Sequence, residues 1–223
     1  MIFNMKYFLE LFPIIMKSFN VTVILAISSL VFSLIIGTIV ALSSYYKVKV
    51  LNQICKVYVS IFRGTPLMPQ LFFLYFGLAY MSDFVKNMDP VFATSIVLSL
   101  NMGAYMSETI RASILSIDKG QIEAAYAMGL TNLQTMKRIV IPQAVRVALP
   151  SLFNNFIDLI KGSSVAFVVG VNDIMGAAKS QGALSFKFFE VYGAVMVIYW
   201  CIITPLGWGT KKIRKENKQL LSY

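Results

Sequence analysis

The chain of 223 residues contains no histidine, and it has only 10 acidic residues against 20 Lys and Arg. Histidine is the commonest general base and a frequent zinc ligand, so its absence excludes a Ser-His-Asp or Cys-His catalytic centre. The two cysteines, Cys55 and Cys201, lie outside any metal-ligand spacing, and we interpret both as ordinary apolar residues. No G-x-x-x-x-G-K-[ST] segment occurs, so the chain is not expected to bind ATP through a P-loop.

Charge of either sign is also scarce, at 13% of residues, which is about half the share in a soluble domain. Hydrophobic residues make up 57%, and the mean hydropathy is +0.71. This composition excludes intrinsic disorder and indicates a single domain, residues 1–223, that lies in a lipid bilayer. The net charge of +10 fits either a nucleic-acid partner or the basic cytoplasmic loops of a membrane protein.

An α-helix that crosses a bilayer needs roughly 20 mostly apolar residues. Five stretches are candidates, and they are residues 18–46, 64–82, 90–107, 147–171 and 191–210. The predicted fold class is therefore an all-α integral membrane protein with about five transmembrane helices. A short interfacial helix is expected before the first span.

Five crossings place the two termini on opposite sides of the membrane. Most Lys and Arg residues then fall on the side of the C-terminus, in segments 45–63 and 111–146 and in the tail after Thr210. The positive-inside rule puts this side in the cytoplasm and the N-terminus outside. The distribution explains the net charge without nucleic acid, and the basic tail is expected to touch anionic membrane lipid.

The segment between the third and fourth spans, about residues 116–142, is too long for a simple connector. Either Ser116 or Asp118 is a suitable N-cap for a helix that begins nearby, and Gly129 is a suitable C′ glycine to end it. We therefore predict a short cytoplasmic helix followed by a sharp turn.

A second short helix is expected directly after this turn. Thr131 and Gln134 match the capping box S/T-x-x-E/Q. Pro142 is expected to stop or kink this helix, because proline has no N–H and clashes with the preceding turn.

The first of these helices contains Glu123, Ala124 and Ala125. Two small residues allow another surface to approach closely, and the carboxylate offers a charge to pair, so one interpretation is docking to a protein partner. The alternative is a helix that lies on the membrane, with alanines present for their helix propensity. The pattern alone leaves both open.

A longer motif resembles a known family. Glu123-Ala124-Ala125, Gly129 and Ile139-Val140-Ile141-Pro142 follow in order the EAA-x3-G-x9-I-x-L-P pattern of the membrane subunits of ABC importers, with Ile141 where leucine is commoner. Further segments are similar to the polar amino-acid uptake permeases over nearly the whole chain: Arg63-Gly64-Thr65-Pro66, Gly120-Gln121, Pro142-Gln143-Ala144 and Lys161-Gly162-Ser163-Ser164. Gly162 departs from the acidic residue that usually follows this lysine.

The resemblance implies a type I importer fold with two permease subunits, the second being a copy or a similar chain. Two cytoplasmic ATPase subunits would dock on the helix with Glu123, Ala124, Ala125 and Gly129, a coupling helix whose motif ends at Pro142. ATP and Mg²⁺ would bind the ATPase, with no cofactor in this chain. An extracellular or periplasmic substrate-binding protein would deliver the solute at a prokaryotic plasma membrane.

Polar residues in the fourth predicted span suggest where the solute passes. Ser151, Asn154, Asp158 and Lys161 share one helical face, and polar groups within a membrane are costly and usually functional. They line a cavity for an amino-acid zwitterion in one hypothesis, whereas Asp158 and Lys161 form only an internal pair in the other. The following segment 162–164 is expected to break the helix, so Ser163 and Ser164 are also candidates.

Two further pathway candidates lie in other spans. Asn101 of the third span either lines the pathway or joins neighbouring helices, and Glu190 at the start of the fifth span either meets a cationic solute group or is an ordinary interfacial acid. Glu108 and Arg111 are expected to form an intrahelical pair.

The predicted function is thus the permease subunit of a binding-protein-dependent importer for a polar amino acid, and segment 166–190 is similar to cystine permeases. The alternative is a self-sufficient secondary carrier or channel, which the intramembrane Asp158 and Lys161 motivate. A membrane enzyme has little support, because no nucleophile–base pair is apparent.

Overall fold

The computed structural model describes residues 3–220, and every element of regular structure in this range is a helix. In chain order the first elements are α1 (Met5–Met16), α2 (Phe19–Tyr45), α3 (Lys49–Gly64), α4 (Leu67–Phe72), the π-helical turn η1 (Phe73–Gly77), the 3₁₀ turn η2 (Leu78–Tyr80) and α5 (Asp83–Lys86). The remaining elements are α6 (Pro90–Leu115), α7 (Lys119–Ala127), α8 (Asn132–Thr135), the π-helical turn η3 (Met136–Val140), α9 (Ile141–Gly162), the 3₁₀ helix η4 (Ser163–Val169), α10 (Ile174–Ser185) and α11 (Phe188–Leu220).

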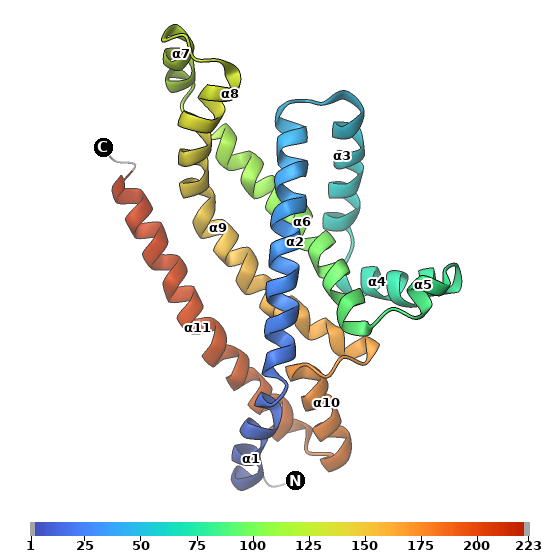
Figure 1. The fold of residues 1–223 in the computed structure, drawn as a ribbon. Coiled ribbons are helices and arrows are strands. Elements are labelled where there is room, and N and C mark those ends of the chain that lie inside the picture. Colours follow the sequence, from blue (N-terminus) through green and yellow to red (C-terminus); the bar gives the residue numbers. More distant parts are fainter. Residues whose placement is uncertain (1–2, 221–223) are drawn as a thin grey trace.

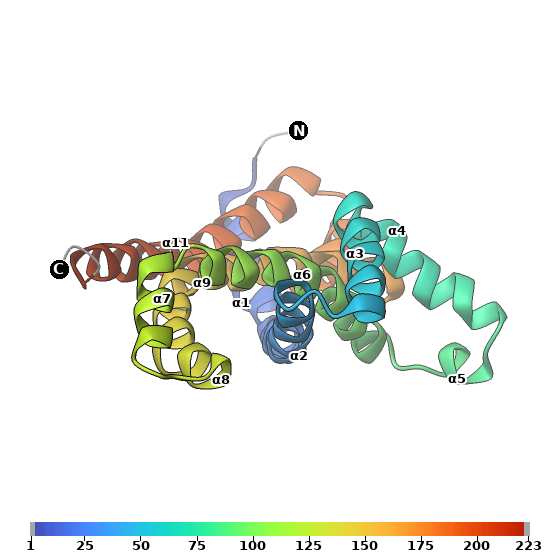
Figure 2. The same ribbon diagram turned by 90° about the horizontal axis from the view of Figure 1, so that it is seen from above.

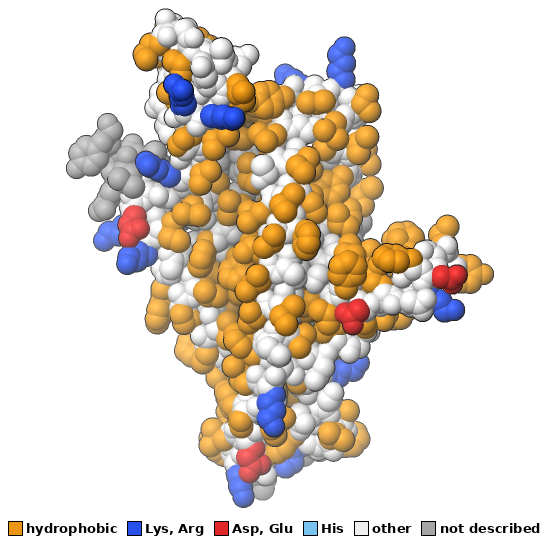
Figure 3. Space-filling view, viewed as in Figure 1, with side chains coloured by type: hydrophobic (Ala, Val, Ile, Leu, Met, Phe, Trp, Pro, Cys, Tyr) orange, Lys and Arg blue, Asp and Glu red, His pale blue; other side chains and the backbone are white. Residues whose placement is uncertain are grey.

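Three helices of the described chain are long and apolar enough to cross a membrane: Phe19–Tyr45, Asn132–Val169 and Phe188–Asn217. They correspond to the first, fourth and fifth predicted spans, residues 18–46, 147–171 and 191–210. The third predicted span corresponds to α6, whose 26 residues extend about 40 Å. Its Ser, Thr and Asn residues make it less apolar than the other three helices. Figure 3 shows hydrophobic side chains over the middle of one face, with Lys and Arg mostly toward the ends.

The second predicted span, residues 64–82, is wrong as a single helix. A helix begins much earlier, at Lys49, and ends at Gly64, because Thr65 is extended and Pro66 and Pro69 supply no N–H groups. The apolar run then folds as the short pieces α4, η1 and η2, which extend sideways from the end of α3 (Figure 1). Segment 45–63 is therefore mostly helix α3.

The core of the molecule lies between α2 and α6, which pack closely along their length. A Cβ on Gly37 would lie 3.0 Å from the Cβ of Met106, and a Cβ on Gly103 would lie 3.0 Å from the Cγ2 of Ile36. The hydroxyls of Ser28 and Ser95 lie 3.1 Å apart across the same interface. Small residues thus let the two backbones approach, as is common between membrane helices.

The two ends of the molecule differ in their elements (Figures 1 and 2). One end, which we call the α7 end, carries α7 and α8, and the C-terminal end of α11 points the same way. At the opposite α1 end, α1 and α10 pack against the beginning of α11, and Leu11, Ile15 and Ile174 are fully buried there. The predicted N-terminal helix is present, and it is packed against the bundle.

Pro142 does not stop the helix in which it lies, although a stop was one of the two outcomes predicted for it. The chain is helical from Asn132 to Val169, and Pro142 occupies the first turn of α9. The wider π-helical turn Met136–Val140 directly precedes it. A change of hydrogen-bonding register at this point accommodates a residue without an N–H, and the helix continues.

Candidate functional site

Helix α7 has the predicted boundaries, each set by a side chain or a backbone angle. The Asp118 carboxylate accepts a hydrogen bond from the Gly120 N–H at 2.8 Å, so Asp118 is the N-cap. At the other end Gly129 has φ of 81°, and the N–H of Leu130 donates to the carbonyl of Ala125 at 3.1 Å. This is a Schellman motif, which reverses the chain sharply after α7.

Helix α8 begins with the predicted capping box. The N–H of Gln134 donates to the Thr131 hydroxyl at 3.3 Å, and the N–H of Thr131 donates to the Gln134 side chain at 2.9 Å. The whole α7–α8 segment thus follows from local sequence, and it projects from the rest of the molecule in Figure 1.

The surface of α7 is divided between exposed and buried residues. Glu123 and Ala124 are exposed, whereas Ala125 is 4% exposed and faces inward. Tyr126 and Met128 add exposed apolar area, and Met128 is 78% exposed. An acidic residue beside exposed apolar side chains at the tip of a helical hairpin is suited to a protein partner.

The polar stripe of α9 lies on one exposed face of this helix, and we define it as Ser151, Asn154, Asp158 and Lys161. The ammonium of Lys161 lies 2.9 Å from a carboxylate oxygen of Asp158, and their side chains are 53% and 55% exposed. An ion pair with this much exposed surface is energetically unfavourable in contact with lipid. The stripe is therefore expected to face water or another protein surface.

The predicted break of this helix at residues 162–164 is wrong, because the α-helix changes to a 3₁₀ helix at Ser163 without an interruption. The Ser163 hydroxyl is fully buried, away from the exposed stripe, and donates to the carbonyl of Ile160 at 2.9 Å. Ser164 donates to the carbonyl of Lys161 at 2.6 Å. The 3₁₀ helix η4 ends at Gly170, where the backbone is left-handed with φ of 89°.

Glu190 lies in the first turn of α11, and it is 6% exposed. One carboxylate oxygen accepts a hydrogen bond from the N–H of Asn4 at 3.0 Å. The structure thus connects this residue to the segment before α1, far along the chain from the α9 stripe.

Asn101 supports the break between α3 and α4. Its side-chain amide donates to the carbonyl of Phe62 at 3.1 Å and to the side chain of Gln70 at 3.0 Å. Gln70 in turn donates to the carbonyl and hydroxyl of Thr65, at 3.0 and 2.8 Å. These hydrogen bonds favour the interpretation in which Asn101 joins neighbouring helices. Gln70 completes the network, and no pattern in the sequence indicated its part in it.

Two turns along α6 from Asn101, the polar surface continues toward the α7 end. Glu108 and Arg111 form the predicted pair at 2.6 Å. The guanidinium of Arg63 lies 5.4 Å from the ring centre of Tyr105, a cation–π contact between α3 and α6. No local sequence pattern pairs Arg63 with Tyr105, because they are far apart in the chain.

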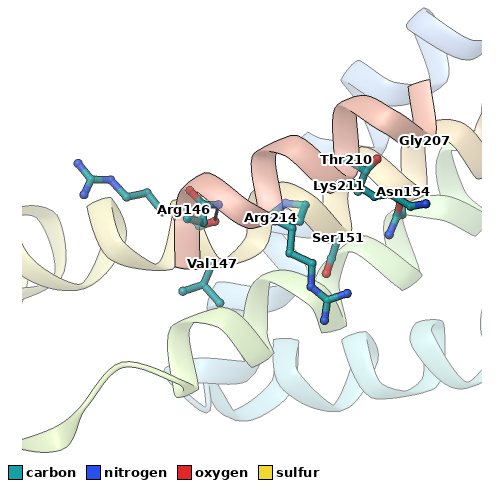
Figure 4. A pocket seen from close by; sticks show the side chains of 10 residues that line it. Arg146, Val147, Ser151, Asn154, Gly207, Thr210, Lys211 and Arg214 are labelled. Carbon is teal, nitrogen blue, oxygen red and sulfur yellow. Dashed lines mark hydrogen bonds between the residues drawn. The ribbon is translucent and has the colours of Figure 1, made fainter. Parts of the chain in front are cut away.

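A cleft of about 630 Å³ separates α9 from α11 on the side of the polar stripe. Ser151 and Asn154 line it from α9, and Thr210, Lys211 and Arg214 line it from α11. Figure 4 shows Lys211 beside Asn154, while the guanidinium of Arg146 extends away from that of Arg214. Near its mouth the Asn217 side chain donates to the carbonyl of Arg146 at 2.6 Å, which joins the two helices.

Asp173 is a buried acid that the sequence analysis missed. It is the N-cap of α10, accepts a hydrogen bond from the N–H of Gly176 at 2.9 Å and is 0% exposed. Its second carboxylate oxygen has no hydrogen-bond partner among the described residues. Burial raises the pKa of this carboxyl to about 6. An Asp before a helical segment was the available signal for the cap, but nothing in the pattern indicated burial.

Within residues 3–220, His, Cys, Asp and Glu form no cluster of three or more that is able to hold a metal ion. Cys55 is buried and Cys201 is exposed, and both are free thiols. The polar features available for function are therefore the α7 surface, the α9 stripe with its cleft, and the polar surface of α6.

Comparison with known sequences gives a family match over most of the chain. Residues 30–213 match the model of the binding-protein-dependent transport system inner membrane component. The probable amino-acid ABC transporter permease protein PatM of Vibrio harveyi is 46% identical over 217 residues, which cover 96% of this chain and 97% of that protein. The L-cystine transport system permease protein TcyL of Bacillus subtilis is 34% identical, with 99% of this chain and 95% of that protein covered.

A solved structure agrees with these sequence relatives. The crystal structure of an amino acid ABC transporter with histidines matches with a TM-score of 0.87 and 28% identity, over 98% of this chain and 100% of that chain. The similarity therefore extends from α1 through α11.

Proposed function

Because the chain belongs to the family of binding-protein-dependent transport system inner membrane components, we propose that it carries a polar amino acid into the cell under the power of a separate ATPase subunit. The chain is a multi-pass membrane protein and the permease subunit of an amino-acid ABC importer, with the type I importer fold. It is a permease component rather than an enzyme.

The observation that carries the proposal is the geometry of α7. A capped helix with Glu123 and Ala124 exposed stands at the tip of the molecule, and a Schellman motif and a capping box hold its orientation. A rigid element is required if the movement of an ATPase is to reach the transmembrane helices. The α7–α8 hairpin continues without interruption into the helix that bears the polar stripe.

The remaining parts of the importer are assigned on the same basis. The α7 end faces the cytoplasm, where the ATPase dimer binds ATP and Mg²⁺, and the α1 end faces outward toward a substrate-binding protein. A second permease subunit, identical or similar, covers the exposed polar stripe. The membrane is the plasma membrane of a prokaryote, as in the bacterial relatives.

The solute is proposed to pass along the α9 stripe. A neighbouring carboxylate and ammonium suit the two charges of an amino-acid zwitterion better than they suit a sugar or a metal ion. Among the relatives are permeases named for L-cystine, arginine and glutamine. Cystine is our first choice, since a relative named for it matches nearly the full length of the chain.

The test is uptake in proteoliposomes that contain this chain, its cognate ATPase and its binding protein, with labelled cystine, glutamine, arginine and histidine offered in turn. We expect uptake of one solute that requires ATP and all three parts. Glu123→Arg should abolish it, whereas Asn132→Arg, also exposed but on α8 rather than on the docking helix α7, should retain it. Uptake by this chain alone would support a secondary carrier and contradict the proposal.

A second measurement tests the docking surface directly. A thiol at Ala124→Cys should crosslink to the ATPase, and one at Ser180→Cys on α10, exposed at the α1 end, should not. Equal crosslinking from both positions, or none from Ala124→Cys in an active complex, would remove α7 as the site of contact.

A further inference from the structure

Two clefts flank α9, and they differ in chemistry. One, of about 240 Å³, lies against α2 and α11 and is lined by apolar side chains that include Ala26, Ile27, Phe156 and Leu206. The other is the 630 Å³ cleft, which is lined by three polar side chains and by three cationic residues: Ser151, Asn154, Thr210, Arg146, Lys211 and Arg214. Lipid chains favour the first kind of surface, whereas the second offers hydrogen bonds that only water or a polar solute satisfies.

The polar cleft is continuous with the α9 stripe. Ser151 and Asn154 belong to both, and one further turn along the same face leads to Asp158 and Lys161. An acyl chain in the cleft would therefore extend into an ion pair. This arrangement argues against a lipid site and for an aqueous passage that opens at the α7 end.

The charges at the mouth of the cleft have one sign. Lys211 and Arg214 line it from α11 and Arg146 lines it from α9, and its lining contains no Asp or Glu among the described residues. The ion pairs of residues 3–217 are Glu108–Arg111 and Asp158–Lys161, so none of these three cations is neutralised in this way. Glu216 lies nearby in sequence but outside the lining.

We propose that the cleft between α9 and α11 is the cytoplasmic part of the solute passage, and that Lys211 and Arg214 make it selective for amino acids with no net positive charge. The proposal rests on the proposed function and names its substrate class: zwitterionic or anionic amino acids pass, and lysine or arginine is disfavoured. A cleft lined with one sign of charge concentrates counter-ions by about tenfold or more and depletes co-ions.

Thiol labelling tests this without transport. Ser151→Cys is introduced into a Cys201→Ser background, since Cys55 is buried. Inside-out vesicles are treated with a membrane-impermeant methanethiosulfonate that bears either a sulfonate or a trimethylammonium group. The rate of labelling at position 151 with each reagent is divided by the rate at which the same reagent reacts with a free thiol in solution. We expect the anionic reagent to be favoured by about tenfold at low salt, and the preference to weaken at 1 M salt.

Matched variants separate the cleft from the general positive charge of this end. Lys211→Glu with Arg214→Glu should reverse the preference. Lys212→Glu with Lys215→Glu makes the same charge change on exposed residues of α11 outside the lining, and it should leave the preference within about threefold. Ile27→Cys in the apolar cleft should react at least about tenfold more slowly than Ser151→Cys, because lipid excludes the reagents.

Protection by solutes tests the substrate class. Glutamine and glutamate at millimolar concentration should slow the labelling of Ser151→Cys, and lysine should not. Equal protection by lysine, or a charge preference that is unchanged in the Lys211/Arg214 variant, would overturn the selectivity. A rate at Ser151→Cys as slow as at Ile27→Cys would overturn the aqueous passage.

These outcomes are distinct from failure of the proposed function, because labelling requires neither ATP nor solute transport. An active importer without charge-selective labelling would retain the proposed function and refute the inference. Absence of ATP-dependent uptake in the reconstituted system would refute the proposed function whatever the labelling pattern.

Discussion

Asp173 shows how a single side chain joins the α1 end together. It caps α10, and the N–H of the next residue, Ile174, donates to the hydroxyl of Thr22 on α2 at 3.3 Å. A Cβ on Gly176 would lie 2.3 Å from the carbonyl oxygen of Val171, so this turn admits only glycine there. The Asp173 side chain is fully buried, and burial disfavours its charged form.

The raised pKa of Asp173 makes the stability of the protein depend on pH. The pKa is about 6 in the folded chain against 3.8 for a free side chain, so between these values the folded state holds a proton that the unfolded state has released. The free energy of unfolding should therefore fall as pH rises from 4 to 6 and stay low above 6. Asp173→Asn should remove this pH dependence and raise the free energy of unfolding at pH 7.5 by up to about 3 kcal/mol.

Thermal unfolding of the purified chain in detergent, measured from pH 4.5 to 8, checks this prediction. Asp118→Asn is the matched control, because Asp118 caps α7 in the same way but is exposed. The control should follow the wild-type pH profile. If Asp173→Asn also keeps the wild-type slope, burial of this carboxylate is not what sets the pH dependence.

At the scale of elements, the turn after α7 depends on one backbone angle. Gly129 has φ of 81°, and a Cβ there would meet no atom within 4 Å. Gly64 is also open to its surroundings but has no left-handed angle. The pair therefore separates the cost of the backbone conformation from that of steric contact.

Gly129→Ala should cost about 1–2 kcal/mol in the folded hairpin, because a left-handed angle is unfavourable for a residue with a Cβ. We expect the variant to assemble but to transport less solute for each ATP hydrolysed, since the coupling element is less rigid. Gly64→Ala should be close to wild type. Uptake and ATP hydrolysis measured together in proteoliposomes decide this, and equal coupling in both variants would contradict it.

The continuous helix Asn132–Val169 contains three kinds of helical hydrogen bonding. The π-helical turn η3 precedes the α-helix α9, and the 3₁₀ helix η4 follows it from Ser163 to Val169. These changes occur only at the two ends of α9. Ser151, Asn154, Asp158 and Lys161 all lie within α9, so their spacing of three and four residues places them on one face.

At the scale of the whole molecule, the distribution of charge predicts its orientation. Most Lys and Arg residues belong to the α7 end, and the positive-inside rule places this end in the cytoplasm. In intact cells a Ser180→Cys thiol on α10 should react with an impermeant maleimide, in the Cys201→Ser background. Asn132→Cys on α8 should react only after permeabilisation, and the reverse pattern would invert the assigned topology.

Local sequence determined the elements whose hydrogen bonds are made within a few residues. Asp118, Gly129 and the Thr131–Gln134 box set the ends of α7 and α8 as predicted, because caps act over one turn. The pairs Glu108–Arg111 and Asp158–Lys161 were predictable for the same reason, since a spacing of three places side chains together. The EAA motif and its flanking segments also indicated the family that the comparisons confirm.

Only the tertiary structure decided the features that depend on contacts between distant segments. Hydropathy predicted a span at residues 64–82. In the structure the helix runs instead from Lys49 to Gly64, and two prolines and the hydrogen bond between Asn101 and Gln70 lie at the break that follows it. Burial of Asp173 depends on how α1, α2 and α11 surround α10. The α9–α11 cleft likewise forms between distant residues such as Ser151 and Lys211, which no local period brings together.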